Sequence, residues 1–72
     1  MQHEKIILTV LKSSGAHSLD DALNPQQLVE KCTASGIAST KDIEAALVSL
    51  IDQDLVEYEM NANTDVTHIW LL

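Results

Sequence analysis

The chain has 72 residues, 46% of them apolar, and its four lysines stand against eleven carboxylates, which gives a formal net charge of −7 at pH 7. This length suits one globular domain with a small core, and the acidity disfavours nucleic acid as a partner. No apolar run approaches the roughly 20 residues of a membrane helix and no signal peptide is evident, so we expect a single cytosolic domain over residues 1–72 with no membrane partner.

The first predicted helix covers residues 3–13. Apolar residues between Ile6 and Leu11 recur on one helical face, and Gly15 follows the small residues that close the helix. Over residues 16–23 the apolar period is unclear. The acidic pair in this segment fits either a short helical turn or a connecting loop.

The second predicted helix covers residues 25–34 and has the clearest start signal. Asn24 is the N-cap, Pro25 takes the first helical position, and Gln27 completes a capping box. Cys32 lies on the core face of this helix as a small apolar residue. A lone cysteine cannot form an internal disulfide, which suits a reducing compartment.

The third predicted helix covers residues 40–53, and Ser39 with Asp42 repeats the capping-box pattern at its start. Helical spacing then divides its side chains into two faces. Those facing the core are Ile43, Ala46, Leu47, Leu50 and Ile51, and those facing outward are Lys41, Ala45, Val48, Ser49 and Asp52.

Two strands complete the chain. Residues 55–60 alternate apolar and acidic side chains, with Tyr58 in the middle of the apolar face. Turn-forming residues fill positions 61–65, and residues 66–71 form a returning strand rich in β-branched and aromatic side chains. The elements together predict an α+β fold, a three-helix bundle followed by a two-stranded antiparallel β-hairpin.

The order helix, helix, tight turn, helix, hairpin resembles a winged helix-turn-helix domain over nearly the whole chain. Residues 37–56, IASTKDIEAALVSLIDQDLV, are similar to the recognition helix of bacterial and archaeal winged-helix regulators running into the wing. In DNA-binding members of that superfamily the third helix enters the major groove and the wing tip reaches the phosphates or the minor groove. The resemblance therefore implies these DNA contacts: Thr40, Lys41, Ser49, Asn61, Asn63 and Thr64.

The distribution of charge opposes that use. Lys41 is the last basic residue, and seven carboxylates follow it without compensation. A recognition helix and wing with this balance gain little from counterion release at phosphates. A DNA-binding transcriptional regulator is therefore the alternative hypothesis, and an acidic mimic that binds a basic partner is a third.

The preferred hypothesis is a regulatory protein-interaction or dimerisation module whose partner is another protein or a second copy of the chain. Ala45 and Val48 put an apolar spot where a DNA reader is usually polar. If Ile69 and Leu71 face inward, the other face of the last strand carries Val66, His68, Trp70 and Leu72. That face needs a cover, from a partner or from the chain itself, and interfaces favour large aromatic side chains such as Trp70. The candidate interface residues are Ala45, Val48, Val66, His68, Trp70 and Leu72.

No residue constellation predicts an enzyme. The three histidines fall in separate segments, two glycines are too few for a phosphate-binding loop, and one cysteine without a nearby histidine gives no zinc site. We therefore predict no catalytic residue, no metal and no cofactor.

Overall fold

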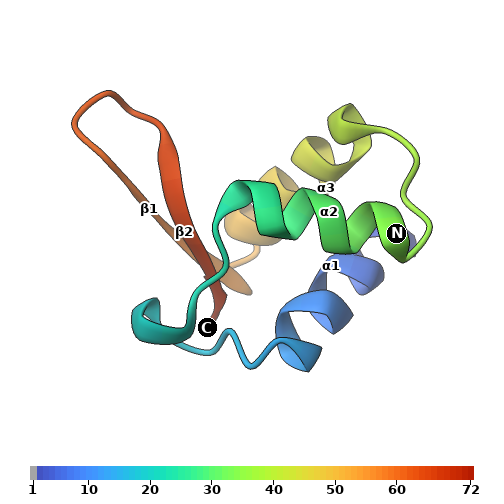
Figure 1. Ribbon diagram of the computed structural model, residues 1–72, viewed down its shortest axis with the longest axis horizontal. Helices are drawn as coiled ribbons and strands as arrows, with labels where there is room; N and C mark the ends of the chain where they lie inside the picture. Colours follow the sequence, from blue (N-terminus) through green and yellow to red (C-terminus); the bar gives the residue numbers. More distant parts are fainter. Residues whose placement is uncertain (1) are drawn as a thin grey trace.

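The computed structural model describes residues 2–72 and has a winged-helix-like layout, with three helices followed by a two-stranded antiparallel sheet (Figure 1). The predicted α+β fold is confirmed, and the helices and strands lie within one residue of their predicted bounds. In chain order the elements are α1 (Gln2–Ser13), the 3₁₀ helix η1 (Leu19–Asp21), α2 (Pro25–Ala34), α3 (Thr40–Asp52), β1 (Val56–Met60) and β2 (Val66–Leu71).

The starts of α2 and α3 differ in their capping. At α2 the predicted capping box is complete, since Asn24 Oδ1 accepts from the Gln27 amide (2.7 Å) and the Asn24 amide donates to Gln27 Oε1 (3.1 Å). At α3 the predicted side-chain cap is wrong, because Ser39 is the N-cap but its side chain makes no capping hydrogen bond. The Asp42 amide donates instead to the Ser39 carbonyl (3.1 Å), so the backbone satisfies the first turn.

All three α-helices end in the same backbone motif, in which a residue with positive φ follows the last turn. Gly15 (φ 70°) and Gly36 (φ 112°) serve α1 and α2, whereas Asp54 (φ 60°) serves α3. In each case the next amide donates to the carbonyl five residues earlier, which is the Schellman pattern. These bonds join Ala16 to Leu11 (3.0 Å), Ile37 to Cys32 (3.1 Å) and Leu55 to Leu50 (3.1 Å).

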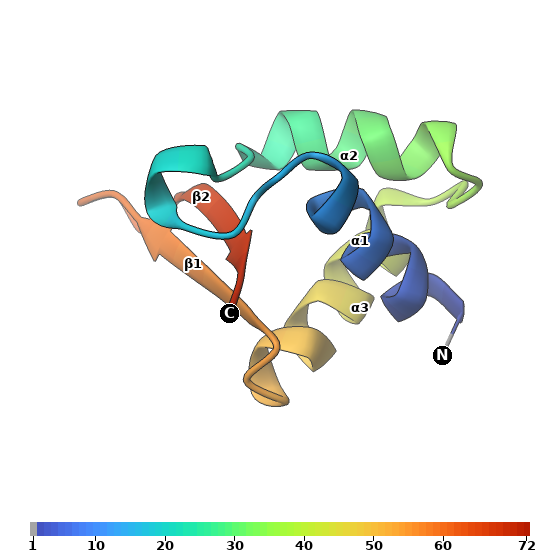
Figure 2. The ribbon, with the colours of Figure 1, turned by 90° about the horizontal axis from the view of Figure 1, so that it is seen from below.

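The core takes side chains from all three α-helices, both strands and the loops between them. Within the described chain no polar or charged residue is fully buried. In Figure 2 the two strands lie to one side of the helices, α1 packs against both α2 and α3, and β1 packs against α3. The buried residues are Ile7, Val10, Leu11, Ala16, Leu23, Leu28, Cys32, Ile37, Ile43, Ala46, Leu50, Val56 and Ile69.

Strand β2 is hydrogen-bonded along both of its edges. On one edge it pairs with β1, and on the other Ile69 exchanges two backbone hydrogen bonds with Leu23 (2.8 and 3.0 Å). The Leu71 amide also donates to the Ala16 carbonyl (2.7 Å). The segment that the sequence left open as turn or loop therefore contains the short helix η1 and runs back along the sheet.

Replacing Asp54 by glycine should raise the free energy of unfolding by about 0.5–1 kcal/mol. Glycine adopts positive φ without strain from a Cβ atom, and the change removes a carboxylate from the negative end of the α3 dipole. Urea denaturation of Asp54→Gly against the wild type measures the difference.

Gly36→Ala is the matched contrast. A Cβ at Gly36 has no neighbour within 4 Å, so its cost comes from backbone conformation alone and should be about 1 kcal/mol. If both substitutions shift stability in the same direction, positive φ does not govern the two helix ends.

Candidate functional site

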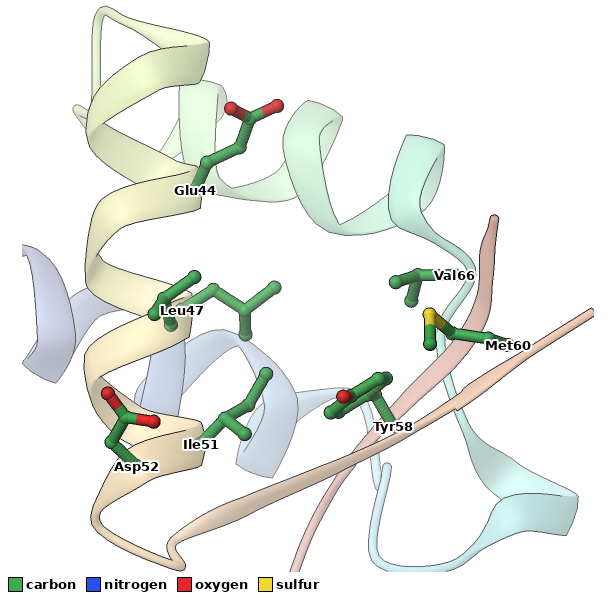
Figure 3. A pocket seen from close by; sticks show the side chains of 8 residues that line it. Glu44, Leu47, Ile51, Asp52, Tyr58, Met60 and Val66 are labelled. Carbon is green, nitrogen blue, oxygen red and sulfur yellow. The ribbon is translucent and has the colours of Figure 1, made fainter. Parts of the chain in front are cut away.

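A groove of about 470 Å³ opens between α3 and the β-hairpin (Figure 3). One wall is α3 and the other is formed by both strands. We call it the α3–hairpin groove and define it by its lining residues, which are Glu44, Leu47, Val48, Ile51, Asp52, Tyr58, Met60 and Val66.

The α3 wall exists because the apolar face of this helix is wider than the part of the helix that the small core buries. Ile43 and Leu50 are fully buried, as predicted. Leu47 and Ile51, also predicted to face the core, are only half-buried and line the groove. Val48 is 57% exposed beside them. The breadth of the apolar face was visible in the sequence, and it is the signal that could have located this wall.

The hairpin wall depends on a bulge at Thr67. Glu59 pairs with His68, but Met60 pairs with Val66, so Thr67 is an extra residue in β2. The bulge brings Val66 onto the same face of the sheet as Met60 and Tyr58. The prediction that Val66 shares a face with His68 and Trp70 is therefore wrong, because strict alternation fails across a bulge.

Two carboxylates stand at the ends of the α3 wall. Glu44 and Asp52 are eight residues apart, about 12 Å along the helix, and project from the same side of it. Figure 3 shows one carboxylate near each end, with Leu47 and Ile51 between them. The groove thus has an apolar middle and an acidic α3 rim.

The predicted interface residues divide into separate groups. Val48 and Val66 line the groove, and Ala45 is exposed on α3 outside it. His68 and Trp70 lie on the opposite face of the sheet. They are half-buried, and Trp70 packs against the edge of the core.

Leu72, the remaining predicted interface residue, is 68% exposed next to the end of β2. The six residues therefore do not form one surface. Sequence reasoning missed Leu47, Ile51, Tyr58 and Met60 as groove residues because it assigned them to the core-facing sides of their elements.

The implied DNA contacts lie apart as well. Thr40 and Lys41 are exposed at the start of α3, whereas the residues of the hairpin tip lie at the other end of the long axis (Figures 1 and 2). Ser49 does not face outward as predicted. Its hydroxyl donates to Glu4 Oε2 of α1 (3.3 Å), and its side chain lies between the two helices.

The hairpin tip uses its polar groups internally. Asn61 Oδ1 accepts from the amides of Asn63 (2.9 Å) and Asp65 (3.1 Å), and Thr64 Oγ1 donates to the Asn63 carbonyl (2.6 Å). These bonds stabilise the turn and engage two of the three side chains predicted to contact phosphates.

Three of the four lysines gather on the α1–α2 side of the molecule. Lys5 and Lys12 flank Thr9 on the solvent face of α1, and Lys31 of α2 lines a shallow hollow together with Thr9. None of the four lysines lines the α3–hairpin groove.

The remaining reactive groups are isolated. Cys32 is fully buried and burial raises the pKa of its thiol, which lowers its reactivity. Over residues 2–72 no three histidine, cysteine or acidic side chains converge in a way that could hold a metal ion. Of the helices described, none is long and apolar enough to cross a membrane.

Comparison of the chain with protein-family models, curated proteins and solved structures gives no match. Because a fold alone does not specify function, what the protein does must be inferred from its own surface.

The contact between α1 and α3 predicts the titration of Glu4. Gln53 Nε2 donates to Glu4 Oε2 (2.8 Å), and this hydrogen bond is the main cause that lowers the pKa of the Glu4 carboxyl. The ionised carboxylate therefore stabilises the fold at pH values above the pKa of Glu4 in the unfolded chain. This contribution is lost as the pH falls through the lowered pKa of the folded state.

Gln53→Ala should raise the pKa of Glu4 towards its ordinary value, as followed by NMR of the carboxyl carbon during an acid titration. Gln26→Ala removes an exposed glutamine from α2, which the Glu4 contact does not involve, and should leave the curve of Glu4 unchanged. An unaltered Glu4 pKa in Gln53→Ala would show that the hydrogen bond does not hold in solution.

Proposed function

We propose that the chain is a winged-helix domain that acts as a protein-interaction module and binds an apolar segment of another protein in the α3–hairpin groove. One observation carries the proposal. Six apolar or aromatic side chains, from α3 and from the hairpin facing it, stay accessible within a single concavity. Scattered exposed apolar residues are ordinary, whereas a cluster of them marks a contact surface.

The kinds of side chain in the groove also support a protein ligand. Tyr58 offers a large apolar ring with a polar tip, and the flexible thioether of Met60 adapts to different partners. Val48 and Met60 are the most exposed of the apolar lining residues, at 57% and 45%. They present the surface that a bound segment would cover.

Duplex DNA receives less support as the ligand. The tip side chains bond within their own turn, and three of the four lysines gather on the α1–α2 side, away from α3 and the hairpin. The two carboxylates of the groove would repel phosphates.

Catalysis receives little support from the same lining. Apart from the Tyr58 hydroxyl, the groups that could take part in chemistry are Glu44 and Asp52, and these stand two helical turns apart. No base and nucleophile adjoin one another among the lining residues.

Selection of a random-peptide phage library on the wild-type chain tests the proposal. Enriched peptides should bind Val48→Gln/Met60→Gln about thirtyfold more weakly, since each of the two replaced side chains contributes on the order of 1 kcal/mol of apolar burial. Fluorescence titration with synthetic copies of the peptides measures the affinities. Both side chains are exposed, so the fold should persist, which circular dichroism checks.

Leu19→Gln/Leu72→Gln is the matched control, because it removes two exposed leucines outside the groove and should leave the affinities unchanged. Duplex DNA at about 50 mM salt should give no gel shift. The proposal fails if the enriched peptides bind both double variants with equal affinity. It also fails if the wild-type chain gives a gel shift with duplex DNA that Lys41→Gln abolishes.

A further inference from the structure

We infer that the occupant of the groove is a basic amphipathic helix from a different protein, with two cationic residues about two turns apart on either side of an apolar ridge. This inference rests on the proposed function and names the partner's chemistry. It starts from the position of Glu44 and Asp52 at the two ends of the apolar α3 wall.

The wider charge distribution favours a cationic ligand. Glu44 and Asp52 line the groove, none of the four lysines does, and the chain as a whole carries −7, whereas Glu57 and Glu59 lie on the opposite face of the sheet. The field at the groove is therefore negative, and such a field speeds the association of a cationic partner and excludes acidic ones.

The geometry of the rim sets the spacing of the partner's charges. A helix lying along α3 meets Glu44 and Asp52 with residues i and i+7 or i+8 of its own sequence, because both helices rise 1.5 Å per residue. Its residues i+3 and i+4 then fall over the apolar middle, between Leu47 and Ile51. This is the helix-in-groove mode of recognition.

A helix fits this site better than an extended strand does. Although β1 leaves one edge of the two-stranded sheet unpaired, the groove itself is lined by apolar side chains from both walls, which suits a helix that makes its contacts through side chains. From Glu44 to Asp52 the α3 wall is about 12 Å long. Side-chain ridges of a second helix can pack into such a wall.

A second copy of the chain matches the groove less well. In a symmetric pair that joins two grooves, the acidic α3 rims of the two copies would face one another, and two chains of charge −7 repel one another. The only basic helical stripe in the described chain is Lys5, Thr9 and Lys12 of α1. It has the right spacing of charges, but a polar residue stands at its centre and Leu8 beside it is already half-buried.

The test uses the full chain, labelled with ¹⁵N, and four designed peptides of about 14 residues. The basic peptide carries two lysines seven residues apart around a leucine ridge. The neutral and acidic peptides replace the lysines by glutamine and by glutamate, and a scrambled peptide keeps the basic composition without the ridge. NMR titration at about 50 mM and about 500 mM salt gives the affinities and the residues that shift.

We expect the basic peptide to bind about tenfold more tightly than the neutral one at low salt, and the difference to shrink at high salt. The shifts should centre on Val48 and Tyr58. The indole signal of Trp70, on the opposite face of the sheet, should not move.

Charge-matched variants locate the effect. Glu44→Gln/Asp52→Asn should abolish the preference for the basic peptide. Asp20→Asn/Asp21→Asn removes the same charge from exposed residues of η1 and should preserve the preference.

The outcomes separate the two proposals. If the basic and neutral peptides bind in the groove with equal affinity, the inference of a basic partner is wrong, but the proposed protein-interaction function is retained. If no peptide binds in the groove, both proposals are wrong. If the scrambled peptide binds as tightly as the basic one, the inference that the partner presents an apolar helical ridge is wrong. An oligomer in sedimentation that Lys5→Gln/Lys12→Gln dissociates shows that a second copy fills the groove, and also overturns the inference.

Discussion

The pairing of Ile69 with Leu23 is the constraint on which the rest of the structure depends. A two-stranded hairpin is marginally stable by itself, but here the inner strand is fixed from its far side. Two backbone hydrogen bonds to Leu23 and a third from Leu71 to Ala16 tie β2 to the segment that leads from α1 to α2. Ile69 is fully buried at the same point. Strand β1 is hydrogen-bonded to β2 and follows directly from α3. The hydrogen bonds of β2 to Leu23 and Ala16 therefore also set the separation between the hairpin and α3, and this separation forms the groove.

Charge and packing are divided along the chain in a related way. The helices α1 and α2 carry three of the four lysines, while α3 and the hairpin carry most of the carboxylates and only one lysine, Lys41 at the start of α3. The fold tolerates this because the carboxylates stay in water, where salt screens their repulsion. A surface of this kind favours cationic ligands over anionic ones. The same residues that weaken the case for DNA therefore strengthen the case for a basic protein segment.

The sequence predicted most of what is decided locally, with the side-chain cap at Ser39 as the exception. The Asn24 cap and the glycine at position 15 act within one turn of the chain, and both were recognised. Features that depend on tertiary structure were mistaken. The burial of Leu47 and Ile51 depends on how much of α3 the core covers, and the direction of Ser49 depends on Glu4, 45 residues away in the chain. The face of Val66 depends on strand register. The groove is built from such non-local features, which is why half of its lining was first assigned to the core.

The bulge at Thr67 has a consequence for how this hairpin could diversify. It divides β2 into two parts that are out of phase. Near the base, Ile69 faces the core and cannot change without loss of stability, while beyond the bulge Val66 faces the groove. The Thr67 hydroxyl, which donates to the Glu59 carbonyl (3.3 Å), holds the two parts in this relation. Residues of the outer part can therefore be replaced to suit a new ligand while the inner part keeps the fold, so one inserted residue separates the requirements of binding from those of folding.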